Sequence, residues 1–179
     1  MTEVQLLCDA VQAANFISEQ KSAELSEKML SLLNQHQVEE AKLLVHVENC
    51  AKSANEEIYQ HIGELNRAIF EEKKVLLVYR RRIIGKKNAV EYEEREHTVS
   101  PYAMIWSEDH YYLVGNNVKY DNLMVLRVDR IYTLTVLEEE HARPFSEVSP
   151  YSEFFDSADY VQNHFNMFSG SPEKIELIC

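Results

Sequence analysis

The stretch that decides the fold is residues 97–137, which read HTVSPYAMIWSEDHYYLVGNNVKYDNLMVLRVDRIYTLTVL. It holds the only tryptophan of the chain, five of its tyrosines, and two arginines three positions apart, Arg127 and Arg130. Short runs of β-branched and aromatic residues separated by polar turns are typical of β-strands. The stretch therefore predicts the centre of a β domain.

The strands of this domain are predicted to begin upstream of the stretch. VLLVYRRRII at 75–84 favours a strand, and GKKN after it favours a turn. Five short strands over about 65 residues cannot bury both faces as a flat sheet, and a small closed barrel is the usual solution. We therefore predict a five-stranded SH3-like or Sm-like barrel with strands at 75–84, 90–106, 111–115, 124–128 and 132–137.

Helices are predicted before the barrel, which makes the fold class α+β. Apolar residues recur every three or four positions in 2–16 and again in a segment capped by Ser18 or Ser22. A short helical turn is expected at 36–44, whereas 45–52 is ambiguous between strand and loop. A longer helix at 56–72 has Ile58, Ile62, Leu65 and Ile69 on one face, with Ser53 or Asn55 as its N-cap.

Composition predicts a folded protein of the cytoplasm. The chain has 179 residues, is 45% apolar and has a net charge of −12. No apolar run approaches the roughly 20 residues that cross a bilayer, and the first residues do not resemble a secretion signal. The three cysteines are scattered, so we expect reduced thiols, buried at Cys8 and Cys50.

The positive charges are concentrated in one part of the acidic chain. Only residues 61–100 are net positive, with 9 basic and 7 acidic groups, and seven of these cations lie between Lys73 and Lys87. A polyanion would be received there. The alternative is a strand and hairpin that charged side chains keep soluble.

Motifs for catalysis and for metal or cofactor binding are absent from the sequence. The four glycines are isolated, so no phosphate-binding loop can form, and the histidines never fall at metal-ligand spacing. No serine lies in a nucleophile elbow. We therefore expect a protein that is not an enzyme and has no cofactor.

Several ordered blocks resemble the WYL domain family, named for a Trp-Tyr-Leu triplet. Here the triplet reads Tyr111, Tyr112 and Leu113. The other matching residues are Val99, Ser100, Pro101, Tyr102 and Ala103, followed by Leu126, Arg127, Val128, Asp129, Arg130 and Ile131. The resemblance covers about residues 56–140. His97 stands where many members have arginine, so this cation is weakened or is charged only below about pH 6.5.

The resemblance implies a domain organisation. Residues 1–55 look like the helical linker or dimerisation segment that follows a winged helix-turn-helix in bacterial WYL regulators. Residues 56–140 are the WYL domain with its entry helix. Residues 141–179 look like a connector and the first strand of a truncated C-terminal extension domain. We expect the chain to be part of a longer regulator.

The resemblance also implies a ligand site, because the WYL barrel is regarded as a sensor of nucleic-acid fragments or nucleotides. Arginines grip phosphate and tyrosine rings stack on bases. The expected ligand-binding residues are Tyr79, Arg81, His97, Tyr112, Arg127 and Arg130. For Arg127 a pair with Asp129 or Glu138 is the structural alternative, and the tyrosines could instead be barrel core. We expect Tyr111, Leu113 and Trp106 to be packing residues.

The predicted function is the ligand-sensing region of a bacterial transcription regulator. A nucleic-acid or nucleotide effector would act on a helix-turn-helix domain, and thus on DNA, in a homodimer with no membrane association. The alternative is a stand-alone WYL module that binds single-stranded nucleic acid, or that modulates a larger nucleic-acid-processing or defence complex.

Overall fold

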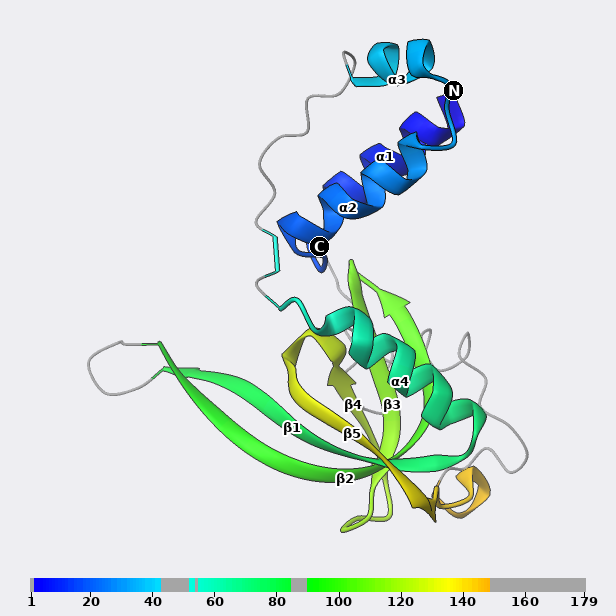
Figure 1. Cartoon of the computed structure of the whole chain (residues 1–179). Coiled ribbons are helices and arrows are strands. Elements are labelled where there is room, and N and C mark those ends of the chain that lie inside the picture. Colours follow the sequence, from blue (N-terminus) through cyan, green and yellow to red (C-terminus); the bar gives the residue numbers. More distant parts are fainter. Residues whose placement is uncertain (1, 43–51, 54, 85–89, 149–179) are drawn as a thin grey trace, which may run out of the picture. The chain divides into compact units, whose positions relative to one another are not determined.

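The computed structural model describes residues 2–42, 52–53, 55–84 and 90–148 (Figure 1). Helices come first: α1 (Thr2–Ala13), α2 (Glu19–Leu30), α3 (Gln35–Lys42) and α4 (Ile58–Phe70). Strands follow: β1 (Lys73–Ile84), β2 (Val90–Ser107), β3 (His110–Asn117), β4 (Leu123–Arg127) and β5 (Ile131–His141). Two 3-10 turns complete the order, η1 (Val128–Arg130) and η2 (Phe145–Glu147).

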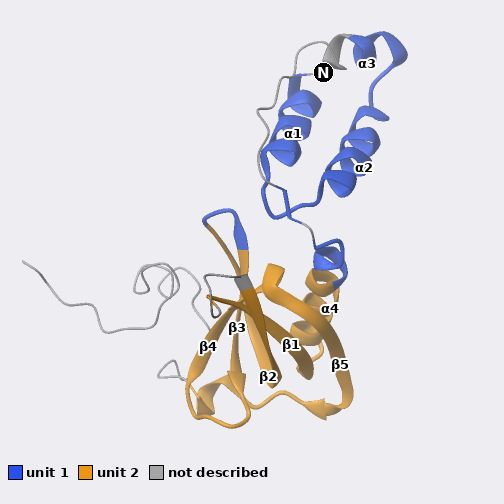
Figure 2. Ribbon diagram, turned by 90° about the vertical axis from the view of Figure 1, so that its left-hand side faces the viewer, with its two compact units in different colours: residues 1–60, 108–110 blue, residues 61–107, 111–179 orange. Residues whose placement is uncertain are grey.

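The chain divides into two compact units (Figure 2). Unit 1 contains residues 1–60 and 108–110, and unit 2 contains residues 61–107 and 111–179. The α+β fold class predicted from the sequence is confirmed, with helices followed by a five-stranded sheet.

Unit 1 is built on the pair α1 and α2, whose ends are fixed by side chains. Ser18 caps α2 by accepting a hydrogen bond from the backbone N–H of Lys21 at 3.1 Å. The ammonium of Lys52 donates to the carbonyls of Val11, at 3.1 Å, and Ala14, at 2.9 Å, next to the end of α1. A cation is favourable there because the C-terminal carbonyls carry partial negative charge.

The surface of α2 carries the ion pair that its sequence predicts. Glu24 accepts from Lys28 one turn later at 2.5 Å and also from Lys21 at 2.7 Å. These hydrogen bonds, first that of Lys21 and then that of Lys28, lower the pKa of Glu24 to about 2. Cys8 is buried on α1, as expected, and burial raises the pKa of its thiol.

Unit 2 is an antiparallel sheet with the strand order β4-β3-β2-β1-β5. The predicted closed barrel is wrong, because β4 and β5 are the two edge strands of an open sheet. β4 has only five residues and pairs with β3 from Leu123 to Arg127. It then runs directly into η1, so its free edge is only five residues long against the eleven residues of β5.

β1 and β2 extend beyond the rest of the sheet as a two-stranded ribbon (Figure 1). The β1–β5 ladder ends at Tyr79, whereas the β1–β2 ladder continues to Ile84 and Val90. β3 has eight residues and follows β2 after a two-residue turn, so it covers only the last part of β2. We call residues 80–84 and 90–95 the arm.

The core of unit 2 comes from alternate strand positions and from one face of α4. Val75, Leu77 and Val99 are fully buried, and so is Leu113 on β3. On α4 the predicted apolar face is confirmed at Ile58 and Leu65, which are buried, whereas Ile62 and Ile69 are half-buried. The other buried positions of this helix are His61 and Ala68. Arg67 on the exposed side pairs with Glu138 of β5 at 2.9 Å.

Trp106 is not the packing residue that the sequence predicts. Its side chain is 46% exposed, whereas its neighbour Ile105 is only 5% exposed. Successive residues of a strand point to opposite faces, so burial of Ile105 turns Trp106 outward. The edge of the Tyr111 ring, with centroids 4.7 Å apart, packs against it. Tyr111 is half-buried and Leu113 is fully buried, as predicted.

Some predictions fall outside the described residues. They are the ambiguous run at 45–51, burial of Cys50, the turn at 85–88 and the strand of a C-terminal extension within 149–179. Within the described part of the chain, no helix has the length and apolar character needed to span a bilayer.

Replacing Gly63 with alanine is expected to raise the free energy of unfolding of unit 2 by about 0.5–1 kcal/mol. Gly63 lies within α4, and a Cβ added there would meet nothing within 4 Å. Alanine therefore removes backbone freedom from the unfolded chain without a clash. Denaturant unfolding followed by the fluorescence of Trp106, the only tryptophan, measures the change. An unchanged or lower stability would contradict it.

Candidate ligand site

The structure brings Tyr79, Tyr112 and Arg127 together from three strands. Tyr112 on β3 and Arg127 on β4 are directly opposite each other in the β3–β4 ladder. Side chains of such a pair lie on the same face of the sheet. The backbone N–H of Arg127 donates to the hydroxyl of Tyr79 at 3.4 Å, so the middle of β1 joins the group.

The guanidinium of Arg127 is held by Asp129 in a two-point contact. Nε donates to Oδ1 at 3.0 Å and Nη2 donates to Oδ2 at 2.6 Å. Partial burial acts to lower the pKa of Arg127, but the hydrogen bonds and charge of Asp129 outweigh it and the pKa is raised. The structural alternative for Arg127 is thus present, with Asp129 as the partner. The contact also fixes the orientation of the guanidinium beside both tyrosines.

Arg130 and Arg81 are exposed cations close in sequence to Arg127 and Tyr79. Arg130 is exposed at the end of η1, three residues after Arg127. Arg81 is exposed on the arm, on the same face of β1 as Tyr79, two residues away. Both side chains are therefore accessible to solvent and lie close in sequence to two members of the group.

His97 lies on β2 opposite Leu77, on the face of the β1–β2 ladder that also carries Tyr79. Its Nδ1 is 2.9 Å from the Nδ2 of Asn117. The Oδ1 of Asn117 accepts from the backbone N–H of Lys119 at 3.0 Å, which orients the amide so that Nδ2 faces the ring. Nδ1 of His97 is therefore the acceptor, and the neutral ring carries its proton on Nε2.

Two effects keep His97 neutral at pH 7. Burial lowers its pKa first, and the positive charges of Arg95 and Lys119 lower it further. The histidine therefore adds no charge to the site, in line with the weakened cation expected from the sequence. The two cations that repel a proton from His97 contribute positive charge beside it instead.

Comparison with known proteins identifies the region that carries this group. Residues 60–136 match the family model of the WYL domain. The chain contains a WYL domain. One solved structure, "Proteasome accessory factor B/C (PafBC) of Arthrobacter aurescens", is 21% identical with a TM-score of 0.40; the match covers 59% of this chain and 15% of that one. The chain thus spans a small part of the length of that protein. No curated protein matches the chain.

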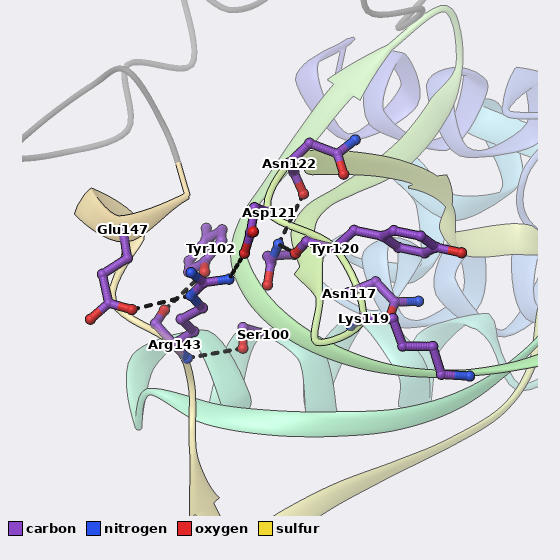
Figure 3. A network of polar contacts seen from close by, with 10 residues as sticks. Ser100, Tyr102, Asn117, Lys119, Tyr120, Asp121, Asn122, Arg143 and Glu147 are labelled. Carbon is purple, nitrogen blue, oxygen red and sulfur yellow. Dashed lines mark hydrogen bonds and ion pairs between the residues drawn. The ribbon is translucent and has the colours of Figure 1, made fainter.

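The motif residues of the WYL domain at 99–102 have a structural role. Ser100 accepts a hydrogen bond from the backbone N–H of Arg143 at 2.9 Å, and the hydroxyl of Tyr102 donates to the carbonyl of Arg143 at 2.9 Å (Figure 3). The Arg143 guanidinium donates to Asp121 at 2.7 Å and to Glu147 at 3.1 Å. Together they fasten the segment after β5 to the loop at 118–122.

Three residues of this WYL domain were missed as parts of the site by sequence reasoning. Asp129 was considered only as an alternative partner of Arg127, and its two-point contact depends on the geometry of η1. Asn117 and Lys119 lie in a predicted loop. Asn117 is twenty positions from His97 in the sequence, and nothing in the sequence indicates that either loop residue lies close to this histidine. The Asn-Asn pair at 116–117 was the available hint, because buried amides hold loops by hydrogen bonds.

Acid is expected to destabilise the WYL domain partly through His97. The folded-state pKa lies below the unfolded value of about 6.5, so the unfolded chain binds more protons between these values. The contribution is complete above pH 6.5 and is lost as pH falls through the folded pKa. Wild type should therefore lose more stability between pH 7.5 and 5.5 than His97→Gln, measured by denaturant unfolding. Equal losses in both proteins would contradict the assignment.

Proposed function

We propose that this chain is a non-catalytic sensor region whose WYL domain binds a short single-stranded nucleic acid or nucleotide effector. The tyrosine cluster, which we define as Tyr79, Tyr112 and Arg127, is the proposed receiving surface. We further propose that the effector controls a regulator of transcription in the bacterial cytoplasm, through a DNA-binding domain elsewhere in the full protein.

The observation that supports this proposal best is that the guanidinium of Arg127 is held in place by Asp129 on a residue that neighbours two tyrosines. Asp129 holds it by hydrogen bonds of 3.0 and 2.6 Å, and Tyr79 is joined to the backbone of the same residue. Base stacking on an aromatic ring contributes about 1–3 kcal/mol, and an ordered arginine gives a phosphate its geometry. Arg130 and Arg81, which are exposed, would add charge that suits more than one phosphate.

The overall acidity of the chain is compatible with a local site. The net charge is −12, which opposes nucleic acid at long range. Salt screens such repulsion beyond about 8 Å at physiological ionic strength, so the cations near the cluster dominate at contact. Long-range repulsion also suits a sensor, because it keeps general binding to cellular DNA low.

The Arg143 network supplies a proposed route from the site to the rest of the protein. Asn117 contacts His97 at one end of the loop, and Asp121 at the other end holds Arg143. Arg143 begins the segment that leaves β5. An effector that moves His97 or the loop would therefore act on the start of this segment. Such coupling needs two states with different affinity for the effector.

The experiment is equilibrium binding of fluorescein-labelled single-stranded DNA and RNA oligonucleotides, followed by anisotropy at 50 and 200 mM salt. Duplex DNA with the same label is measured in parallel, and unlabelled cyclic nucleotides are added as competitors. These two measurements distinguish single strands, duplexes and nucleotides as ligands. We expect single strands to bind more tightly than duplex and affinity to fall with salt. If neither oligonucleotides nor cyclic nucleotides bind, the proposed function is wrong.

Replacing Asp129 with asparagine is expected to tighten oligonucleotide binding a few-fold. Asparagine keeps the size of the side chain but removes the negative charge next to Arg127, which is 2.6 Å away at its closest. Asp121→Asn is the matched control, since it removes the same charge from the exposed partner of Arg143. Weaker binding by Asp129→Asn would mean that orientation of Arg127 matters more than its free charge.

A further inference from the structure

His97 lies next to the tyrosine cluster on the β1–β2 ladder. Arg95 is opposite Tyr79 in this ladder, and His97, two residues further along β2, is on the same face. Diagonal neighbours of this kind are within reach of long side chains. A phosphate attached to a base that stacks on Tyr79 can therefore reach the ring of His97.

The hydrogen bond between His97 and Asn117 requires a neutral ring. Nδ1 of His97 accepts from Nδ2 of Asn117 at 2.9 Å, and Oδ1 of the same amide accepts from the backbone N–H of Lys119 at 3.0 Å. A protonated ring has two N–H donors and no acceptor. Protonation would therefore set two donors against each other, and turning the amide over would break its bond to Lys119 instead.

The loop that carries Asn117 leaves this side chain little freedom (Figure 3). Asn117 is 4% exposed, and its backbone carbonyl accepts from the N–H of Tyr120 at 2.9 Å. The amide of Asn116, which is fully buried, donates to the carbonyls of Tyr120 at 2.8 Å and Asn122 at 2.9 Å. A proton on His97 therefore requires Asn117 to give up one of its two side-chain contacts.

The charged groups that act on the ring of His97 are both cations. Arg95 comes from β2 itself, with Glu93 as its partner at 2.8 Å, and Lys119 comes from the loop after β3. The residue opposite on β1 is Leu77, which has no charge. Burial first, and then the two cations, lower the pKa of His97. An anion bound beside the ring would favour its charged form.

We propose that binding of a phosphate-bearing effector at the tyrosine cluster takes up one proton at His97 and breaks its hydrogen bond to Asn117. This inference rests on the proposed function and adds its regulation by pH. The proton comes from solvent and binds to Nδ1, which Asn117 releases. The change begins in the loop whose other end, at Asp121, holds the guanidinium of Arg143 at 2.7 Å.

The direction of the pH dependence follows from the two protonation equilibria. In the free protein the pKa of His97 lies below its usual value of 6.5, and in the complex the effector raises it. The complex therefore holds more protons than the free protein at pH values between these two pKa values. Effector affinity should rise as pH falls through the pKa of the complex, and it should level off below the pKa of the free protein.

The test is isothermal titration calorimetry of the whole chain with an unlabelled thymidine oligonucleotide, which does not titrate between pH 5.5 and 7.5. Heats in two buffers of different ionisation enthalpy give the number of protons taken up. Wild type should take up protons and bind at least about threefold more tightly at pH 5.5 than at pH 7.5. His97→Gln should show neither effect. His141→Gln, at an exposed histidine, is the control and should behave as wild type.

Replacing Asn117 with aspartate provides a second variant of nearly the same shape. Its carboxylate can accept from both the N–H of Lys119 and a protonated His97, so the ring is already charged in the free protein. Effector binding should then take up fewer protons than in wild type. Asn122→Asp is the matched control, because it adds the same charge at an exposed position of this loop, and its proton uptake should equal that of wild type.

The ring signal of His97 in NMR spectra gives a readout that needs no variant protein to bind. Its titration midpoint in wild type should move to higher pH when the oligonucleotide saturates the protein. An unchanged midpoint, or equal proton uptake by wild type and His97→Gln, would overturn this inference and leave the proposed function standing. Absence of oligonucleotide binding at every pH would overturn both.

Discussion

Replacing Gly115 with alanine is expected to lower the free energy of unfolding of unit 2 by about 3 kcal/mol. The Cβ would lie 2.6 Å from Cγ1 of Val99 and 2.8 Å from the backbone carbonyl oxygen of Ser100. Val99 and Ser100 are both fully buried, and Ser100 holds Arg143, so neither can easily move. Glycine in a strand commonly marks such a close approach of another backbone.

Trp106 fluorescence during denaturant unfolding measures this loss within the unit that contains Gly115. Gly63→Ala is the matched control, because the same substitution on α4 is expected to stabilise. If Gly115→Ala lowers the free energy of unfolding and Gly63→Ala raises it, the loss at Gly115 is due to close packing and not to a general effect of alanine. A loss below about 0.5 kcal/mol for Gly115→Ala would mean that β2 and β3 adjust to the extra methyl group.

Replacing Arg127 and Arg130 together with alanine is expected to weaken binding of a single-stranded oligonucleotide about 10- to 100-fold or more. A hydrogen bond to a charged group contributes about 1.5–3 kcal/mol, and tenfold in affinity is about 1.4 kcal/mol. Arg127 stands beside both tyrosines, and Arg130 is exposed on the following turn. The alternative function of Arg127, to hold Asp129, predicts a loss of stability with little loss of affinity.

The control for this variant removes two cations elsewhere. Arg67→Ala with Lys74→Ala changes the net charge equally, and both side chains pair with glutamates of β5. Its oligonucleotide affinity should stay within about twofold of wild type. An equal loss in both double variants would mean that net charge, and not the tyrosine cluster, determines binding.

Strand positions could be predicted from the sequence because side-chain type and turn residues are local signals. The turn between β2 and β3 is one example: Glu108 and Asp109 both have positive φ, of 47° and 57°, in a two-residue hairpin. The closed barrel could not be decided in this way. Closure depends on whether β4 can pair with β5, and the length of a strand before a 3-10 turn has no clear sequence signal.

The residues of the candidate site could be predicted from the sequence more fully than the contacts between them. The resemblance to the WYL family pointed to Tyr112 and Arg127, and the β3–β4 register places them opposite each other. The partners that set the charge state, Asp129 and Asn117, depend on side-chain contacts between loops. The basic run at 80–82 is also less able to bind a polyanion than its charge implied, because Arg80 is paired with Glu94 of the neighbouring strand.

The measurement that tests the central claim most directly is the salt dependence of oligonucleotide binding for wild type and for the Arg127 and Arg130 double variant. Each phosphate contact on a single strand contributes about −0.7 to the slope of log affinity against log salt. If both arginines bind phosphate, the slope of the double variant should be shallower by about 1.4. Equal slopes and equal affinities in the two proteins would contradict the assignment of the tyrosine cluster as an effector site.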